Sequence, residues 1–360
     1  MRREEYKRLG EYIAPYLEKN VGLKVTLSQG INNNKYFQTP RQVAVDSEND
    51  QIVRTGQFAY NKATTRNGEK ISIAYREGPD CTVSSAYQVF YITDENKLNP
   101  HYLLMWFKRP EFDRYARFKS FGSAHEFFTW EEMCNVYLPI PSIDEQRKIV
   151  AEYQAVEQRI ENNNRLIKAL EDTAQAIYHH TFVENIDPDN LPEGWEIKAL
   201  KDLATFKYGK LAEKKTYSID TPYPIFSGYA ITGYCDEYTI DKPTIVVIAR
   251  GDSGTGKICL SPKKCFLSNL AISIDINDDR LKYYIYHFML NADTMSLRSG
   301  SAQAQITIKD LEPFEIVLPP IQFCEKFSKF YKNIYRQIES IKTEKESLSS
   351  LLKLLLAKLS

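Results

Sequence analysis

The chain has 360 residues, with 47 Lys and Arg against 47 Asp and Glu, so its formal net charge is zero. This length allows two domains with cores of their own, and the balanced charge counts against a protein that grips nucleic acid alone through a basic surface. No apolar run approaches the roughly 20 residues that a membrane span requires, and no signal peptide is expected, so the expected location is cytoplasmic. The six cysteines form no Cys-x-x-Cys pair, which favours free thiols over a disulfide framework or a zinc site.

Residues 1–141 are expected to form a mixed α/β domain. Short runs rich in β-branched and aromatic residues are typical of strands, and a last strand before Pro139 and Pro141 would close the domain. The two early strands, a helix and the closing strand are expected at residues 71–75, 87–91, 101–107 and 135–138.

A long helix is expected to open the next segment, residues 142–186, which ends in a linker. Ser142 and Glu145 fit a capping box, in which Ser142 caps the helix and Glu145 reaches back to it. Neither Pro nor Gly interrupts the sequence before about Phe182. About forty residues at 1.5 Å each would make a rod of roughly 60 Å.

Residues 187–319 are expected to form a second domain with the same order of elements, followed by a second long helix at 320–360. Residues 200–204 echo residues 9–13. The expected strands, helix and closing strand lie at residues 244–248, 271–274, 283–289 and 314–318.

The second half of the chain repeats the first with a fixed offset. The tripeptide Gly-Ser-Ala at 122–124 recurs at 300–302, and 300 − 122 = 178. The same shift carries Pro141 onto Pro319, and it carries one 4-3 repeat onto another, which is the a/d seam of a coiled coil. The expected seam comprises Ile149, Tyr153, Val156, Ile160, Asn163, Ile167, Leu170, Ala174 and Ile177, then Phe327, Tyr331, Ile334, Ile338, Ile341, Lys345, Leu348, Leu352 and Leu355.

The two helical segments carry opposite charge, which favours pairing them with each other. Residues 142–186 hold 5 Lys and Arg against 8 Asp and Glu, and residues 320–360 hold 8 against 4. Two seam positions are polar, Asn163 and Lys345. Asn163 is either a tolerated polar residue or a buried one that fixes register. Both positions could instead mark where the seam opens or meets a partner protein.

Residues 251–257 fit the G-x-x-x-x-G-K half of a phosphate-binding loop. The next residue is Ile258, where such a loop needs Ser or Thr for magnesium, and the sequence that follows is β-like instead of helical. A β-hairpin with a polar, basic tip is therefore favoured, and it could enter a DNA groove with Arg250 and Lys257 as donors.

Two segments imitate a metal-dependent nuclease. Asp80 with Glu95 and Lys97 copies the PD…ExK array, but residues 93–100 favour a polar turn and not the strand that this chemistry needs. Asp189 with Glu196 and Lys198 forms a second imitation, in which the gap between the two parts is too short. We interpret both as surface charge. The sequence shows no catalytic constellation, so we expect no enzyme activity in this chain, no resident metal and no cofactor.

Three segments resemble motifs of the specificity subunit of type I restriction–modification systems. Residues 138–149, Leu-Pro-Ile-Pro-Ser-Ile-Asp-Glu-Gln-Arg-Lys-Ile, look like that family's approach to its long helix. Residues 191–195, Leu-Pro-Glu-Gly-Trp, look like the start of a target-recognition domain, and residues 248–258 resemble its Arg- and Gly-rich hairpin. With the duplication, the similarity covers essentially the whole chain. The first domain lacks the Leu-Pro-Glu-Gly-Trp start, and Phe323-Cys324 stands where Glu-Gln is usual in the second helix.

This resemblance implies an α+β fold with two similar target-recognition domains, joined and followed by long helices that form an antiparallel coiled coil with a pseudo-twofold repeat. Each domain would read one half of a split site in double-stranded DNA, and the helices would set the unread spacer. Two modification subunits would dock on the helices, and restriction subunits would join them. S-adenosylmethionine, ATP and magnesium would belong to those partners.

Base contacts are expected from polar loop residues that can donate or accept hydrogen bonds. In the first domain the candidates are Lys62, Thr64, Arg66, Asn67, Ser120, Ser123 and His125. In the second they are Lys207, Tyr208, Lys210, Tyr229, Arg250, Ser253, Lys257, Arg298, Ser301, Gln303 and Gln305. Any one of them could instead be an ordinary solvated residue. The rival interpretation is a coiled-coil scaffold that binds no DNA, which the zero net charge favours slightly.

Overall fold

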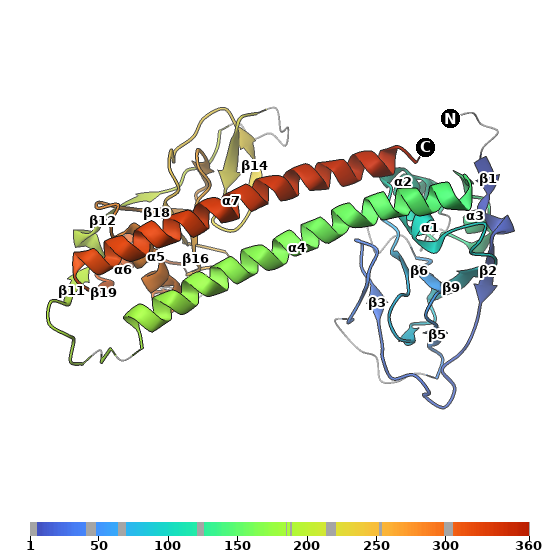
Figure 1. Cartoon of the computed structure of the whole chain (residues 1–360), viewed down its shortest axis with the longest axis horizontal. Helices are drawn as coiled ribbons and strands as arrows, with labels where there is room; N and C mark the ends of the chain where they lie inside the picture. The colour runs from blue at the N-terminus through green and yellow to red at the C-terminus, as the bar shows by residue number, and fades with distance from the viewer. Residues whose placement is uncertain are drawn as a thin grey trace. The chain divides into compact units, whose positions relative to one another are not determined.

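The computed structural model describes residues 6–40, 48–63, 70–120, 126–184, 186–187, 189–213, 221–251, 254–298 and 305–359. The chain divides into a first unit, Met1–Asn163 with Thr343–Ser360, and a second unit, Asn164–Lys342. Both long helices contribute to both units (Figure 1). The division falls within one residue of equivalent positions of the repeat, because the boundaries after Asn163 and after Lys342 are 342 − 163 = 179 residues apart.

A four-stranded antiparallel sheet in the order β2-β9-β6-β7 forms the centre of the first unit. Phe58 and Phe90 of this sheet stack with ring centroids 5.1 Å apart, and Phe107 meets both rings edge-on. Smaller antiparallel pairs join β1 to β10, β5 to β8 and β3 to β4. The elements are β1 Tyr6–Arg8, β2 Ile13–Tyr16, β3 Gly30–Ile31, β4 Phe37–Gln38, β5 Gln51–Val53, β6 Phe58–Asn61, β7 Ile73–Tyr75, β8 Cys81–Val83, β9 Tyr87–Ile92, α1 Pro100–Phe107, α2 Pro110–Phe118, α3 Trp130–Cys134 and β10 Tyr137–Pro139, with a 3-10 turn at Leu9–Glu11.

The second unit is built in the same order around the antiparallel sheet β12-β18-β15-β16. A pair β11-β19 and a three-stranded sheet β14-β13-β17 complete it. Its elements are β11 Glu196–Ala199, β12 Ala204–Tyr208, β13 Tyr223–Phe226, β14 Ile231–Cys235, β15 Ile245–Ile248, β16 Ile258–Leu260, β17 Phe266–Leu267, β18 Ala271–Ile276, α5 Lys282–Asn291, α6 Ile308–Leu311 and β19 Glu315–Leu318, with a 3-10 turn at Leu200–Asp202.

The repeat extends to individual hydrogen bonds. The hydroxyl of Tyr102 donates to the carbonyl of Pro139 at 3.1 Å, and that of Tyr284 donates to Val317 at 2.5 Å. The acceptors are 178 residues apart. The same offset separates the acceptors of two backbone bonds, both 2.8 Å long, which run from Leu9 N to Val136 O and from Leu200 N to Phe314 O. Each globular part is thus closed by the same contacts at the strand that precedes its long helix.

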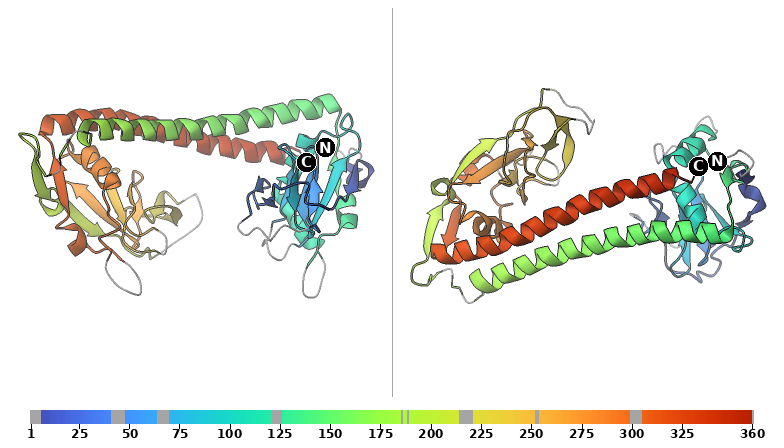
Figure 2. Two further views of the ribbon diagram at one scale, coloured as in Figure 1. Left: turned by 90° about the horizontal axis from the view of Figure 1, so that it is seen from below. Right: turned by 45° about the horizontal axis from the view of Figure 1, so that its top comes forward.

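The two long helices are α4, Ile143–Phe182, and α7, Ile321–Ala357. Ser142 accepts a hydrogen bond from Glu145 N at 3.4 Å, as expected of a helix cap. Within each unit, the segments of α4 and α7 run side by side in opposite directions (Figure 2). Among the described residues, the structure contains no helix with the length and apolar character to cross a lipid bilayer.

The helix seam in the second unit is aromatic. Tyr178 and Phe182 near the end of α4 contact Phe327 near the start of α7, with ring centroids 5.7 and 5.5 Å apart. The expected seam residue Ile177 is 38% exposed, whereas Tyr178 is 2% exposed, so that expectation is wrong. The step after Ala174 is four residues instead of three, because the helix here faces Tyr284 of α5 as well as α7.

The other expected seam positions are buried or half-buried along both helices. Fully buried are Tyr153, Asn163, Ala174, Phe327, Tyr331, Ile334 and Ile338. Half-buried are Ile149, Val156, Ile160, Ile167, Leu170, Ile341, Lys345, Leu348, Leu352 and Leu355.

Asn163 has a partner on the opposite helix. Its amide donates to Glu344 Oε2 at 3.0 Å, and Arg159 donates to Glu344 Oε1 at 2.9 Å. Asn163 is 4% exposed. A buried amide that finds its acceptor in only one alignment of two helices favours that alignment, so the contact supports the interpretation of Asn163 as a register residue. Lys345, the other polar seam position, follows Glu344 directly.

Candidate nucleic-acid interface

One end of the central sheet in the second unit gathers most of its candidate residues. β12 and β15 end there, and β16 and β18 begin there, because Tyr208 and Val247 both lie opposite Ile272 and Val247 lies opposite Ile258. We call this end the loop edge and define it by residues 207–210, 248–251, 254–258 and 268–272.

Residues 248–251 and 254–258 form the two arms of the predicted hairpin. Ile248 N donates to Lys257 O at 3.0 Å, and Gly256 N donates to Ile248 O at 2.9 Å. The strand β16 follows Lys257 directly, so the helix that a phosphate-binding loop needs does not follow. Gly256 has a φ of +92°, and a Cβ on it would lie 3.1 Å from Thr294 O, so both its conformation and the close approach favour glycine.

Four cations on the loop edge are exposed and available to a ligand. Lys207, Lys210, Arg250 and Lys257 are all exposed, and none of them forms an ion pair with another described residue. Uncompensated cations on strand ends and turns can bind phosphate oxygens or the acceptor atoms of base edges. Gly209 allows the backbone of residues 207–210 to approach that of Ser268 closely, since a Cβ at this position would collide with the carbonyl of Ser268.

Two neighbouring segments bring further candidates to the loop edge. Gln305 forms an isolated antiparallel β-bridge with Arg250, and Ile306 N donates to Ala249 O at 2.8 Å. Tyr229, 66% exposed, lies on the turn between β13 and β14, and a Cβ on Gly254 would be 3.9 Å from its ring. The hydroxyl of Tyr208 is already occupied, because it accepts a hydrogen bond from Ile308 N at 3.0 Å.

Arg298 uses its donors inside the protein. Its Nε and Nη2 donate to the carbonyl of Thr255 at 3.0 and 2.6 Å, and Thr294 Oγ1 donates to Gly256 O at 2.6 Å. Residues 294–298 therefore hold the tip of the hairpin. The sequence predicts Arg298 as a DNA contact and not in this role, because a hydrogen bond to a backbone carbonyl leaves no signature in the sequence.

The first unit has an equivalent edge. Phe128 N donates to Lys62 O at 2.9 Å, and Ala63 bridges Phe127, which repeats the bonds of Ala249 with Ile306 and of Arg250 with Gln305. Lys62 is half-buried there. Ser120 is less available, since its hydroxyl donates to Ala116 O at 2.7 Å. The remaining candidates lie outside the described residues: Thr64, Arg66, Asn67, Ser123, His125, Ser253, Ser301 and Gln303.

A buried ion pair in the first unit was not predicted. Lys35 Nζ and Asp113 Oδ1 are 2.5 Å apart, with side chains 4% and 10% exposed. Lys35 also donates to Ile71 O, and Asp113 accepts from Ile71 N at 3.2 Å. Burial lowers the pKa of Lys35, although the carboxylate opposes this. The pair therefore fixes Ile71 just before β7, close in sequence to the candidates at 62–67.

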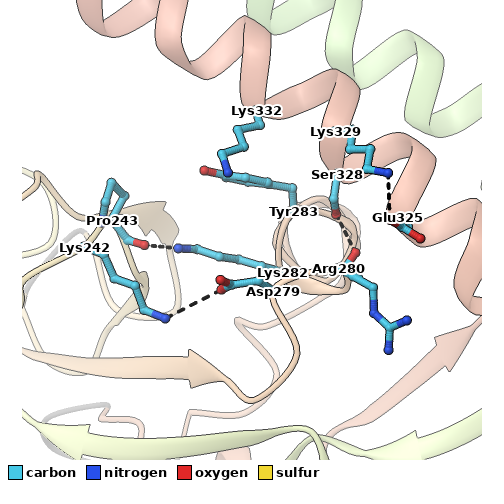
Figure 3. A pocket seen from close by; sticks show the side chains of 10 residues that line it. All are labelled: Lys242, Pro243, Asp279, Arg280, Lys282, Tyr283, Glu325, Ser328, Lys329 and Lys332. Atoms are coloured by element: carbon cyan, nitrogen blue, oxygen red, sulfur yellow. Dashed lines mark hydrogen bonds and ion pairs between the residues drawn. The ribbon is translucent and has the colours of Figure 1, made fainter.

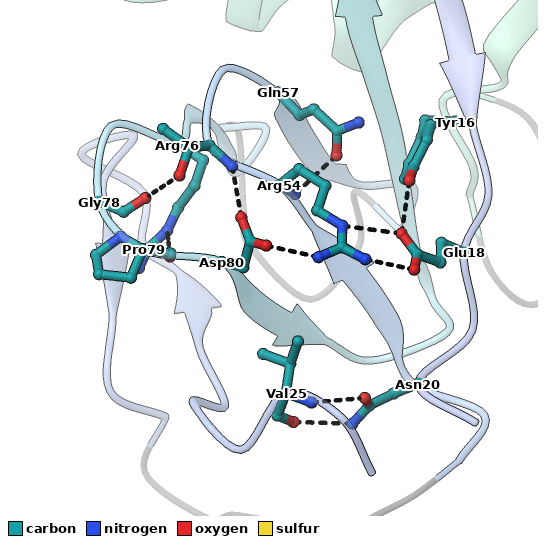
Figure 4. A network of polar contacts seen from close by, with 11 residues as sticks. Tyr16, Glu18, Asn20, Val25, Arg54, Gln57, Arg76, Gly78, Pro79 and Asp80 are labelled. Carbon is teal, nitrogen blue, oxygen red and sulfur yellow. Dashed lines mark hydrogen bonds and ion pairs between the residues drawn. The ribbon is translucent and has the colours of Figure 1, made fainter. Parts of the chain in front are cut away.

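A second network surrounds Arg54 (Figure 4). Its guanidinium contacts Glu18 at 2.5 Å and Asp80 at 2.6 Å, and its hydrogen bonds hold the pKa of both carboxyls below their usual range. Asp80 belongs to one of the nuclease-like segments. Its carboxylate is committed to Arg54 and to Thr55 N, which agrees with our interpretation of that segment as surface charge. Among the described residues, no three His, Cys, Asp or Glu side chains are grouped to hold a metal ion.

The architecture defines a protein with two repeated mixed domains, each closed onto a shared pair of antiparallel helices. The family model described as the type I restriction modification DNA specificity domain matches residues 10–172 and 192–350. The chain therefore belongs to the family of type I restriction–modification specificity subunits.

Relatives agree with this assignment. The chain is 20% identical to a Methanocaldococcus jannaschii protein provisionally named as the MjaX type I restriction enzyme specificity subunit, across 91% of this chain and 84% of that protein. It is 23% identical to the MjaIX specificity subunit of the same organism, across 66% and 62%. The crystal structure of a type I S subunit from M. genitalium has a similar fold, with a TM-score of 0.63 at 16% identity, covering 98% of this chain and 95% of that one.

Proposed function

We propose that this chain reads the DNA target of a type I restriction–modification complex, with each globular domain recognising one half of a split site. The observation that carries this proposal is the loop edge of the second unit, where Lys207, Lys210, Arg250 and Lys257 are exposed and have no carboxylate partner in the part of the chain that the structure describes. Phosphate contacts from such cations would position the domain, and base contacts from the hairpin would give specificity. The repeated bonds at Lys62 and Ala63 support an equivalent role for the first unit.

The helices would set the unread spacer and dock two modification subunits. At 40 residues, α4 is roughly 60 Å long. This length exceeds the ~34 Å of one DNA turn, so the helix is long enough to separate two half-sites by that distance. Leu166, Leu351 and Leu354 are exposed on the helices by 47%, 41% and 61%, and partner helices could cover them. The chain itself would be non-catalytic. Restriction subunits would join the complex, and S-adenosylmethionine, ATP and magnesium would bind to the partner subunits.

The test is to express the chain with a candidate modification subunit from the same genome and to map methylated adenines in the host DNA. We expect a new motif made of two short specific halves around a fixed gap. The charge-reversed double variant Arg250→Glu/Lys257→Glu should abolish its methylation. The matched control Lys201→Glu/Lys263→Glu changes the same charge on exposed lysines outside the loop edge and should leave the motif methylated.

Three outcomes would count against the proposal. Normal methylation by the loop-edge variant would remove the hairpin from recognition. Equal loss in the control would show that only overall charge matters. If the unchanged chain neither directs methylation nor co-purifies with the modification subunit, the scaffold interpretation would replace this one.

A further inference from the structure

A cavity of about 300 Å³ lies in the second unit between the start of α5 and the first turns of α7 (Figure 3). It is at the end of the sheet opposite the loop edge, because Pro243 precedes β15 and Asp279 follows β18. Its lining holds five cations and only two carboxylates: Lys242, Arg280, Lys282, Lys329 and Lys332 against Asp279 and Glu325.

The carboxylates near the cavity are already committed to three of these cations. Lys329 pairs with Glu325 at 2.7 Å, Lys242 with Asp279 at 3.6 Å, and Arg280 with Asp278 at 2.7 Å. Neither Lys282 nor Lys332 forms an ion pair with a described residue. The positive charge that remains uncompensated is therefore carried by these two lysines.

Lys282 is the unusual member of the set. It is 9% exposed, and its ammonium donates to the carbonyl of Pro243, which leaves further N–H donors for another acceptor. Burial lowers its pKa, and the charges of Lys242 and Lys332 act in the same direction, whereas the carboxylates of Asp279 and Asp275 oppose them. A buried ammonium without a carboxylate is costly to the fold unless something else neutralises it.

In the first unit, the equivalent contact lies between the start of the long helix α4 and the residues before α1; we call it the joint between helix and domain. Gln146 is completely buried, and it accepts from Asn99 N at 2.8 Å and donates to Lys97 O at 2.9 Å. Val150, one turn further on, is 6% exposed in the apolar core. Asn99 caps α1 with its side chain. Helix and domain thus meet here through a buried amide and apolar packing.

The repeat places different residues at the same joint in the second unit. An offset of 178 carries Gln146 onto Cys324, Val150 onto Ser328 and Gln154 onto Lys332. The start of α5 has no side-chain cap and no acidic residue in its first turn. Uncapped backbone N–H groups at a helix start attract anions. Two of these replacements, Ser328 and Lys332, line the cavity, and they are more polar or more basic than their equivalents in the first unit.

We propose that this cavity binds a small phosphate-bearing anion through Lys282 and Lys332. The volume is near the lower end of the range for ligand pockets, roughly 300–1,000 Å³, so it would hold a phosphate or diphosphate group and leave any attached nucleoside outside. The anion would link α5 of the recognition domain to α7. This site is independent of the DNA-reading role proposed above.

The test is isothermal titration calorimetry of the full-length chain with pyrophosphate, ATP and inorganic phosphate at constant ionic strength and without magnesium. We expect saturable one-to-one binding. Lys282→Met and Lys332→Met should each weaken binding about tenfold or more, since each removes a charge-assisted hydrogen bond. Lys326→Met, which removes an exposed charge from the same helix outside the cavity, should bind as the unchanged chain does.

The ligands separate the possible sources of the anion. Equal affinity for pyrophosphate and ATP would assign recognition to the phosphates alone, and tighter ATP binding would assign it to a nucleotide. Absence of saturable binding for all three at millimolar concentration would overturn the proposal. An equal loss in Lys326→Met would do the same, because it would show general surface attraction. If Lys282→Met failed to fold, Lys332→Met on the rim would still decide between these outcomes.

Discussion

The role of Arg298 gives the sharpest prediction. If Arg298 positions the hairpin, its loss should leave the salt dependence of DNA binding unchanged, whereas loss of a direct phosphate contact should reduce it. The structure assigns its donors to Thr255 O at 3.0 and 2.6 Å. A hydrogen bond from a charged group contributes about 1.5–3 kcal/mol, and exposure of Arg298 reduces this to about 1 kcal/mol through solvent screening. Arg298→Met should therefore release the hairpin tip and weaken DNA binding about fivefold to tenfold.

The assay is fluorescence anisotropy with the mapped target DNA and the complex of this chain with its modification subunit, repeated over a series of salt concentrations. A lost phosphate contact lowers the slope of log K against log salt by about 0.9. Lys257→Met should show that change, because Lys257 is exposed on the loop edge. Arg298→Met should weaken binding with an unchanged slope. A slope reduced as much as in Lys257→Met would refute the positioning role and restore Arg298 as a direct contact.

Three further predictions concern the fold. Asp113→Asn should lower the free energy of unfolding by about 3–5 kcal/mol, because it leaves Lys35 buried without its carboxylate; urea denaturation measures this, and Lys35→Met/Asp113→Leu should recover much of the loss. His287, whose pKa burial lowers to about 3, stays neutral in the fold while the unfolded chain takes up a proton below about pH 6.5. Stability should therefore fall as the pH drops through this window, by up to ~1.4 kcal/mol per pH unit, and His287→Phe should flatten that dependence. Asn163→Ala should cost about 1 kcal/mol through the lost bond between the helices, whereas the exposed Asn164→Ala should not; equal effects would contradict a register role.

Elements with strong local patterns could be predicted from the sequence. The helix expected at 101–107 is α1, Pro100–Phe107, and the strand expected at 271–274 is β18, Ala271–Ile276. The long helix expected to reach Phe182 ends there. Capping residues and heptad spacing are encoded within a few turns, so they are visible without the fold.

Contacts between distant residues could not be predicted in this way. Lys35 and Asp113 are 78 residues apart, and each alone resembles an ordinary surface charge. Arg298 reaches a backbone carbonyl, which has no signature in the sequence. A strict heptad repeat predicts Ile177 as a seam residue after Ala174. The structure differs because α4 packs here against α5 as well as α7, and the sequence does not show this second neighbour.

The repeat is more informative where its two copies differ than where they agree. Shared features such as the Tyr102 and Tyr284 hydroxyl bonds maintain the joint between domain and helix, so they are explained by folding alone. At the same joint, Gln146 of one copy accepts from Asn99 N, whereas Ser328 and Lys332 of the other copy line an open, basic cavity. Packing needs do not explain a buried lysine at this joint in one copy only, since the other copy reaches the same fold there with apolar and amide groups. A difference that costs stability in only one of two equivalent folds is best explained by a ligand for that copy.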